Sequence, residues 1–176
     1  MKKLEDYVVS IPDFPEPGII FRDVTSILQD ADGPALAIDS IREMVKDLDY
    51  DVVVGPESRG FIFGVPVAYA EHKSFVPIRK KGKLPRETVS QSYELEYGTD
   101  SIEIHADAIS SKDTVLILDD LVATGGTVEA TGKLVRGMGA KLVGYGCILE
   151  LAFLNPREKL TPSDDDVELF SLVTVD

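Results

Sequence analysis

Residues 115–127 read VLILDDLVATGGT: an apolar strand that ends in two carboxylates, then a turn of small residues and the start of a helix. Gly125 and Gly126 let the backbone approach an anion closely, and the hydroxyls of Thr124 and Thr127 can donate to phosphate oxygens. The helix N-terminus adds unpaired N–H groups and the positive end of the helix dipole. The stretch therefore predicts a phosphate site at a strand–turn–helix junction.

The two carboxylates, Asp119 and Asp120, indicate what accompanies the phosphate. They would repel an anionic ligand unless they bound another part of it, and vicinal sugar hydroxyls or a magnesium ion are natural partners. A phosphate beside a diol is typical of a ribose phosphate. A plain strand-to-helix turn with capping threonines would explain the glycines, but it would not explain the adjacent carboxylates.

Two other nucleotide-binding loops do not match the sequence. Gly126 and Gly132 are one residue too far apart for GxxxxGK[ST], Lys133 precedes Leu134, and no GxGxxG occurs. A kinase or a Rossmann nucleotide-binding site is therefore disfavoured, and the lack of a general-base histidine counts against a phosphatase with a similar loop.

Outside this stretch, short β-branched runs alternate with amphipathic stretches, which is typical of an α/β fold with a parallel sheet flanked by helices. The strands are expected at residues 51–55, 74–78, 114–118, 142–150 and 167–173. Apolar residues at helical spacing predict helices over 34–48 and 126–138. The length of 176 residues favours one domain, residues 1–176.

Two segments do not fit the alternation. Residues 11–22 hold three prolines and a glycine, so they cannot form a regular helix or a central strand, and they are expected to cover another part of the molecule. Residues 80–100 are polar and charged, and an insertion of that length is more often a lid or a hairpin than a passive connection.

The composition excludes several classes of function. A net charge of −13 argues against nucleic acid or an anionic membrane as a partner, and no apolar run is long enough to span a membrane. No signal-like stretch follows the N-terminus, so the cytoplasm is the expected location. Cys147 lies in an apolar run and is expected to fill the core rather than act as a nucleophile.

The apolar strand, Asp-Asp pair and TGGT loop resemble the signature of the type I phosphoribosyltransferases. Four further blocks resemble the adenine phosphoribosyltransferase family in the same order: FPEPGIIFRD (14–23), ESRGF (57–61), RKKGKLP (79–85) and LEYG (95–98). The resemblance implies a type I phosphoribosyltransferase fold with an N-terminal hood at about residues 1–30 and a flexible lid at about 80–100. It also implies a homodimeric, Mg²⁺-dependent glycosyltransferase of purine salvage, which makes AMP and pyrophosphate from adenine and phosphoribosyl diphosphate.

The resemblance assigns roles to individual residues. It implies that the 5-phosphate is bound by Ala123, Thr124, Gly125, Gly126 and Thr127, and the ribose hydroxyls by Asp119 and Asp120. The residues expected at the pyrophosphate are Ser58, Arg59, Arg79, Lys80 and Lys83, those expected at adenine are Ile20, Phe21 and Arg22, and the catalytic candidates are Glu96 and Arg59, with Tyr97 on the lid. Magnesium would be held through the pyrophosphate, with Asp119 or Asp120 as a further ligand.

Structural alternatives remain open for three of these groups. The basic cluster of residues 79–86 could be a solvated loop, and Glu96 could be one of several exposed hairpin carboxylates. The N-terminal segment could simply be docked on the core by Phe14, Ile19, Ile20 and Phe21.

Two alternative functions also remain. A phosphoribosyltransferase for guanine, hypoxanthine or xanthine would share the sugar-binding residues, although the hood favours adenine. A non-catalytic sensor of phosphoribosyl diphosphate would need a DNA-binding segment, and the first ten residues are too short for a helix-turn-helix.

Overall fold

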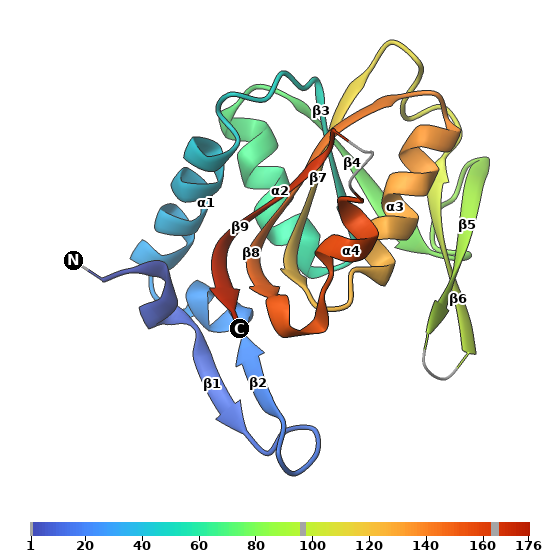
Figure 1. Cartoon of the computed structure of the whole chain (residues 1–176). Coiled ribbons are helices and arrows are strands. Elements are labelled where there is room, and N and C mark those ends of the chain that lie inside the picture. The colour runs from blue at the N-terminus through green and yellow to red at the C-terminus, as the bar shows by residue number, and fades with distance from the viewer. Residues whose placement is uncertain (1, 96–97, 163–165) are drawn as a thin grey trace.

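The computed structural model describes residues 2–95, 98–162 and 166–176, and its main feature is a seven-stranded sheet of order β5-β6-β4-β3-β7-β8-β9 (Figure 1). The strands of this sheet are β3 (Val52–Pro56), β4 (Ser74–Lys80), β5 (Thr88–Leu95), β6 (Gly98–His105), β7 (Thr114–Val122), β8 (Lys141–Leu151) and β9 (Glu168–Val175). The helices are α1 (Asp32–Met44), α2 (Arg59–Ala70), α3 (Gly126–Gly137) and α4 (Arg157–Leu160), with short 3-10 turns at Leu4–Tyr7, Val24–Gln29 and Ala152–Leu154.

Five neighbouring strands of the sheet run parallel, as the sequence predicts: β4, β3, β7, β8 and β9. The last two strands at the other edge differ, because β6 runs antiparallel to both β4 and β5. The predicted parallel sheet is therefore the central part of a mixed sheet, and the polar insertion after β4 supplies its antiparallel edge.

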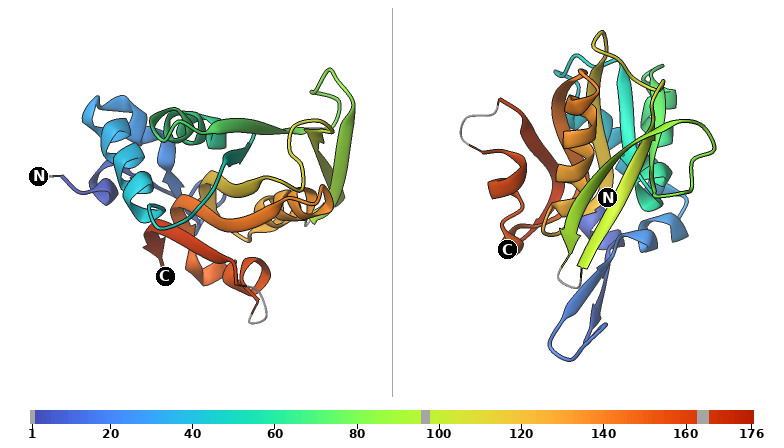
Figure 2. Two further views of the ribbon diagram at one scale, coloured as in Figure 1. Left: turned by 90° about the horizontal axis from the view of Figure 1, so that it is seen from above. Right: turned by 90° about the vertical axis from the view of Figure 1, so that its right-hand side faces the viewer.

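Helices cover both faces of the parallel part (Figure 2). On one face, Ile41 of α1 and Phe63 of α2 pack against Leu116 of β7. On the other face, Leu134 of α3 and Leu160 of α4 pack with Ile117 of the same strand. The alternation of side chains along β7 thus gives two buried layers, which fix the strand that carries the predicted phosphate site.

The predicted strands and the helices α1 and α3 are confirmed to within a few residues at each end. Helix α2 has no counterpart among the predicted elements, since RGFIFGVPVAYA is apolar on nearly every side and shows no clear helical period. Strand β7 is longer than expected and continues to Val122, so the two aspartates lie within the strand rather than beyond its end.

Residues 11–22 contribute to a separate two-stranded antiparallel sheet, in which β1 (Val9–Pro12) pairs with β2 (Ile20–Asp23). The exclusion of a helix or central strand is confirmed, and the prolines lie at the end of β1 and in the connection. This hairpin extends past the end of the main sheet where β7, β8 and β9 finish (Figure 1).

Cys147 is fully buried in β8, and burial raises the pKa of its thiol. This confirms its expected place in the core. Within the described part of the chain, no helix has the length and apolar character that crossing a membrane requires.

Candidate active site

The phosphate loop, residues 123–127, joins the end of β7 to the start of α3. Gly125 precedes the helix in a left-handed conformation, with a φ of 84°, which a side-chain-bearing residue rarely adopts. The first intrahelical bond runs from Glu129 N to Gly125 O at 2.8 Å, so the N–H groups before Glu129 lack helical acceptors. These groups and the helix dipole make the loop suited to an anion.

The loop is supported from behind by the segment that contains α4. A Cβ atom placed on Gly125 would lie 3.3 Å from Leu160 Cγ and 3.5 Å from Pro156 Cβ. Both of these side chains are buried. The turn is therefore held in place by its own backbone conformation and by tight packing.

The two aspartates of β7 lie in different surroundings. Asp119 Oδ1 accepts from the backbone N–H of Asp120 at 2.8 Å. Asp120 Oδ2 lies 2.9 Å from Arg59 Nε, but the angle does not make a hydrogen bond, and this buried oxygen has no hydrogen-bond donor among the described residues. A hydroxyl of a bound sugar is the type of donor that Asp120 lacks.

Burial and mutual repulsion govern the protonation of this pair. The pKa of Asp119 is raised well above its usual range, first by burial and then by the neighbouring charge of Asp120. Burial also raises the pKa of Asp120, and the guanidinium of Arg59 opposes that rise. A cation or a hydrogen-bond donor from a ligand would stabilise the ionised pair.

These groups share one pocket of about 710 Å³ at the carboxyl end of the sheet. Its walls are Glu57, Ser58, Arg59, Tyr93, Glu94, Leu95, residues 119–128 and Lys159. The structure thus brings together all seven residues predicted for the ribose 5-phosphate, together with two of the five predicted for the pyrophosphate.

The other three predicted pyrophosphate residues lie outside the pocket lining. Lys80 Nζ is 3.2 Å from Asp100 Oδ2, and Lys83 is exposed at the following turn. Arg79 Nε is 3.4 Å from Glu57 Oε1, which also accepts from the backbone N–H of Lys80 at 2.6 Å. Glu57 therefore connects the start of this basic segment to the pocket wall.

The predicted adenine residues lie on β2, and they too are outside the pocket lining. Ile20 is exposed, Phe21 packs edge-on against Phe14 with ring centroids 5.3 Å apart, and Arg22 donates to Ser10 Oγ. The two remaining predicted site residues, Glu96 and Tyr97, fall outside the described residues.

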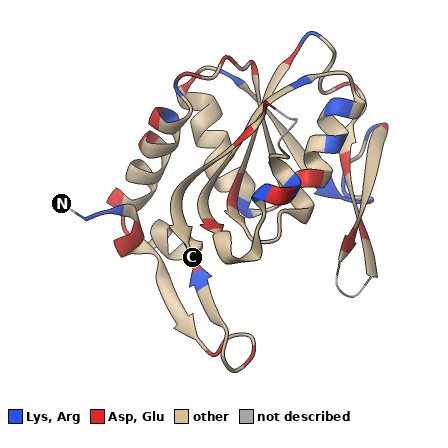
Figure 3. Cartoon of the chain, in the orientation of Figure 1, with Lys and Arg blue, Asp and Glu red and all other residues tan. Residues whose placement is uncertain are grey.

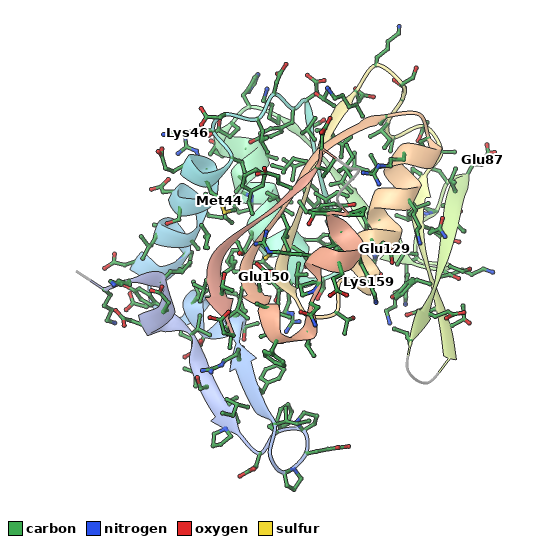
Figure 4. All side chains as sticks on the ribbon, in the orientation of Figure 1. Met44, Lys46, Glu87, Glu129, Glu150 and Lys159 are labelled. Atoms are coloured by element: carbon green, nitrogen blue, oxygen red, sulfur yellow. The ribbon has the colours of Figure 1, made fainter. Side chains whose placement is uncertain are left out.

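Eight pocket residues were not among the predicted site residues: Glu57, Tyr93, Glu94, Leu95, Leu121, Val122, Val128 and Lys159. Tyr93, Glu94 and Leu95 come from β5, which crosses the start of α3, and Tyr93 Cδ2 would lie 3.9 Å from a Cβ on Gly126. A large aromatic residue within a polar insertion is the signal that could have identified Tyr93. Lys159 reaches the pocket because the chain after β8 folds back, and no local motif indicates that (Figure 4).

Among the described residues, no group of three or more His, Cys, Asp and Glu side chains is arranged to hold a metal ion. Asp119 and Asp120 are nevertheless suited to assist Mg²⁺, because this ion is often bound by one or two carboxylates plus the phosphates of a substrate. Figure 3 shows the acidic positions spread over most elements, so the pairing at the end of β7 is a local feature rather than part of an acidic face.

Comparisons with known proteins agree with this geometry. The profile of the phosphoribosyl transferase domain family matches residues 25–176. The adenine phosphoribosyltransferase of Lachnoclostridium phytofermentans is 59% identical over 164 residues, which are 93% of this chain and 94% of that protein. The enzyme of the same name from Petrotoga mobilis is 50% identical, over 97% of this chain and 96% of its own.

Solved structures give the same result. The adenine phosphoribosyltransferase of Thermoanaerobacter pseudethanolicus superimposes with a TM-score of 0.91 at 44% identity, covering 98% of this chain and all of that one. The Saccharomyces cerevisiae enzyme, solved with an imino-altritol bisphosphate and adenine, gives a TM-score of 0.87 at 39% identity, covering 96% of each chain. The chain therefore belongs to the phosphoribosyltransferase family, and the resemblance to the adenine phosphoribosyltransferases within it is confirmed.

Proposed function

We propose that the protein transfers the 5-phosphoribosyl group from phosphoribosyl diphosphate to adenine, giving AMP and pyrophosphate. The observation that carries this proposal is the single pocket that contains the phosphate loop, the Asp119–Asp120 pair and Arg59. The names of the relatives point to the same reaction. The Trypanosoma brucei enzyme, for example, was solved with AMP, pyrophosphate and ribose 5-phosphate.

The 5-phosphate would occupy the turn at residues 123–127. Backbone N–H groups at the start of α3 would donate to its oxygens, and Thr124 and Thr127 would add their hydroxyls. The ribose would then extend toward Asp119 and Asp120. Asp120 Oδ2 is the acceptor available to a ribose hydroxyl.

The pyrophosphate would leave near Ser58 and Arg59, at the start of α2. Mg²⁺ bound to the diphosphate would supply charge neutralisation of the leaving group, and Asp119 or Asp120 could contribute a ligand. Arg79, Lys80 and Lys83 would reach this region only by leaving their present partners or positions. Their part in pyrophosphate binding stays a prediction.

The base would lie between the pocket and the β1–β2 hairpin, where Ile20, Phe21 and Arg22 are the proposed contacts. We propose that residues 1–30 form the hood and residues 80–100 the lid of a single domain spanning 1–176. Glu96 would handle the proton on the base or the leaving group, and Tyr97 would cover the site. Closing this region would exclude water, which would otherwise hydrolyse the activated sugar.

Catalysis would come mainly from positioning and from electrostatic stabilisation. The anomeric carbon takes on oxocarbenium character as its bond to the diphosphate oxygen lengthens and adenine approaches from the opposite face. Arg59 would stabilise the charge that develops on the departing oxygen. Its present ion pair with the buried Asp120 holds the guanidinium at the pocket wall.

We also propose a cytoplasmic homodimer. One face of α2 supports association, because Ile62, Val65 and Tyr69 lie three or four residues apart and are all exposed, Tyr69 to 87%. Measuring the molar mass in solution, with and without a Val65→Glu substitution, would test this assembly.

The reaction is tested by measuring pyrophosphate release from phosphoribosyl diphosphate and Mg²⁺ with adenine, guanine, hypoxanthine or xanthine supplied singly. We expect release with adenine alone. Release with another base instead would keep the sugar-binding assignment and reject the role of the hood. No release with any base would favour a sensor that binds the sugar without reacting.

A further inference from the structure

Cations are scarce in the pocket. Among its described lining residues, Arg59 and Lys159 are positively charged, whereas Glu57, Glu94 and the two aspartates are acidic. Arg59 already faces Asp120 at 2.9 Å. A phosphate dianion placed on residues 123–127 would thus have backbone N–H groups as donors but no cationic side chain from the loop itself.

Lys159 lies on the segment that packs against this loop. It follows Glu158 in α4, the short helix that shows basic, acidic and basic positions in turn (Figure 3). Its neighbour Leu160 is buried against Gly125. Lys159 is exposed and lines the pocket, and none of the described residues forms an ion pair with it.

An ion pair between a buried carboxylate and a half-exposed arginine fixes the position of α4. The side chain of Glu150, at the end of β8, is fully buried, and Arg157 at the start of α4 binds it with two hydrogen bonds, Nε to Oε1 at 2.8 Å and Nη2 to Oε2 at 2.7 Å. Arg157 also donates to Leu169 O at 3.0 Å, and Ser171 Oγ donates to Glu150 at 2.7 Å. Figure 4 shows Glu150 on the sheet and Lys159 on α4, which contacts α3.

We propose that Lys159 binds the 5-phosphate of the sugar substrate, and that the Glu150–Arg157 pair is the positioning device that presents it. Two hydrogen bonds in a fixed fork define the orientation of Arg157, and the helix that begins there carries Lys159 and Leu160 to the same loop. The loop would therefore supply the backbone donors and α4 the charge. This inference rests on the proposed function, since it places the 5-phosphate on residues 123–127.

The test is Lys159→Gln, which removes the charge and keeps much of the side-chain length. Ribose 5-phosphate carries only the 5-phosphate, and pyrophosphate carries only the leaving group, so their inhibition constants separate the two ends of the substrate. We expect the inhibition constant of ribose 5-phosphate and the KM for phosphoribosyl diphosphate to rise about tenfold, as for the loss of one charge-assisted hydrogen bond. The inhibition constant of pyrophosphate and the KM for adenine should stay within twofold.

Lys112→Gln is the matched control, because Lys112 is an exposed lysine remote from the pocket lining and its loss changes the net charge equally. Equal effects of the two substitutions, no change for Lys159→Gln, or an equal rise for pyrophosphate would each overturn the proposal. Wild-type turnover with adenine is measured in the same assay. Its absence would reject the proposed function, whereas its presence with unchanged constants for Lys159→Gln would reject only this inference.

Arg157→Lys tests the positioning device without leaving Glu150 unpaired, since the charge is kept and the two-pronged geometry is lost. We expect the same selective rise for ribose 5-phosphate, about threefold, and no rise for pyrophosphate. In the double variant with Lys159→Gln, the Arg157 substitution should add nothing to the effect on ribose 5-phosphate. Additive effects would show that Arg157 acts independently of Lys159, and would overturn its assignment as a positioning residue.

Discussion

The phosphate loop at residues 123–127 rests on buried side chains, whereas the β1–β2 hairpin leaves most of its apolar side chains exposed. Leu160 and Pro156 lie behind Gly125, and β7 beneath the loop is packed on both faces. In the hairpin, Ile20 is 57% and Phe14 is 50% exposed. The first region is held by the core, and the second is held by its own strand pairing and a ring contact.

This difference between the loop and the hairpin suits the two regions to different tasks, the placement of the sugar and the recognition of the base. A reaction at the anomeric carbon depends on exact placement of the sugar, and packed surroundings reduce the entropy lost on placing it. A flat base can be recognised by apolar contact from one side, which a projecting hairpin can supply. Substitutions in the two regions should therefore change different kinetic constants.

The largest effect should come from Asp120→Asn. The substitution keeps the shape of the side chain but replaces a carboxylate that faces Arg59 with a neutral amide. We expect kcat/KM for phosphoribosyl diphosphate to fall about 100-fold, as for the loss of one electrostatic contact in an active site. Wild-type kinetics in a folded variant would remove Asp120 from the site.

Gly125→Ala should have the next largest effect. It tests whether the loop depends on the side chains that pack behind it. An alanine at a φ of 84° costs about 1–2 kcal/mol, and its Cβ would crowd Leu160 at 3.3 Å. We expect the KM for phosphoribosyl diphosphate to rise about tenfold, with the KM for adenine unchanged.

Gly137→Ala is the control for that change. Gly137 is at the end of α3, and a Cβ there would meet nothing within 4 Å. Its kinetics should match those of the wild type. If both variants behave alike, the conformation of Gly125 is not what holds the substrate.

The same contrast explains which parts of the site could be predicted from sequence. The strand, Asp119, Asp120 and the glycine turn are consecutive, so their chemistry is visible in one stretch, and the structure places them in one pocket. Tyr93 and Lys159 reach that pocket through the crossing of β5 and the return of α4. Such long-range placement leaves no local pattern.

Helix α2 was not predicted, and the β5–β6 hairpin was predicted only as a lid or hairpin over residues 80–100 without its strands, for different physical reasons. Helix α2 packs on the sheet while exposing apolar residues such as Val65, so it lacks the polar face from which helical periodicity is recognised. The β5–β6 hairpin has mostly exposed residues along β5, and strands of that kind do not show an apolar alternation. The proposed role of the β1–β2 hairpin in binding the base comes only from the resemblance to the family.

Phe21→Ala tests the hairpin side of the comparison and should have a smaller effect. Losing one aromatic contact with adenine is worth about 1 kcal/mol, so the KM for adenine should rise about fivefold while the KM for phosphoribosyl diphosphate stays constant. Phe14→Ala removes the ring partner of Phe21 without removing a proposed adenine contact. If both substitutions raise the adenine KM equally, Phe21 serves the packing of the hairpin rather than the binding of the base.

The smallest effect concerns the stability cost of burying a carboxylate in the packed region. Burial, followed by the charge of Asp120, raises the folded-state pKa of Asp119. Below about pH 4 the Asp119 side chain is protonated in both the folded and the unfolded protein. As the pH rises toward the folded-state pKa, the unfolded chain releases this proton first, so the free energy of unfolding falls. Asp119→Asn removes this penalty and should become increasingly more stable than the wild type above about pH 4.

Asp51 provides a control of opposite sign, because the hydrogen bond from the backbone N–H of Thr114 lowers its pKa. The stability that Asp51 contributes is present above the unfolded-state pKa and is lost as the pH falls, so Asp51→Asn should be less stable than the wild type at neutral pH and approach it in acid. Urea unfolding of the three proteins across pH measures both differences. Parallel curves for Asp119→Asn and the wild type would mean that the packed end of β7 accommodates its carboxylate without cost.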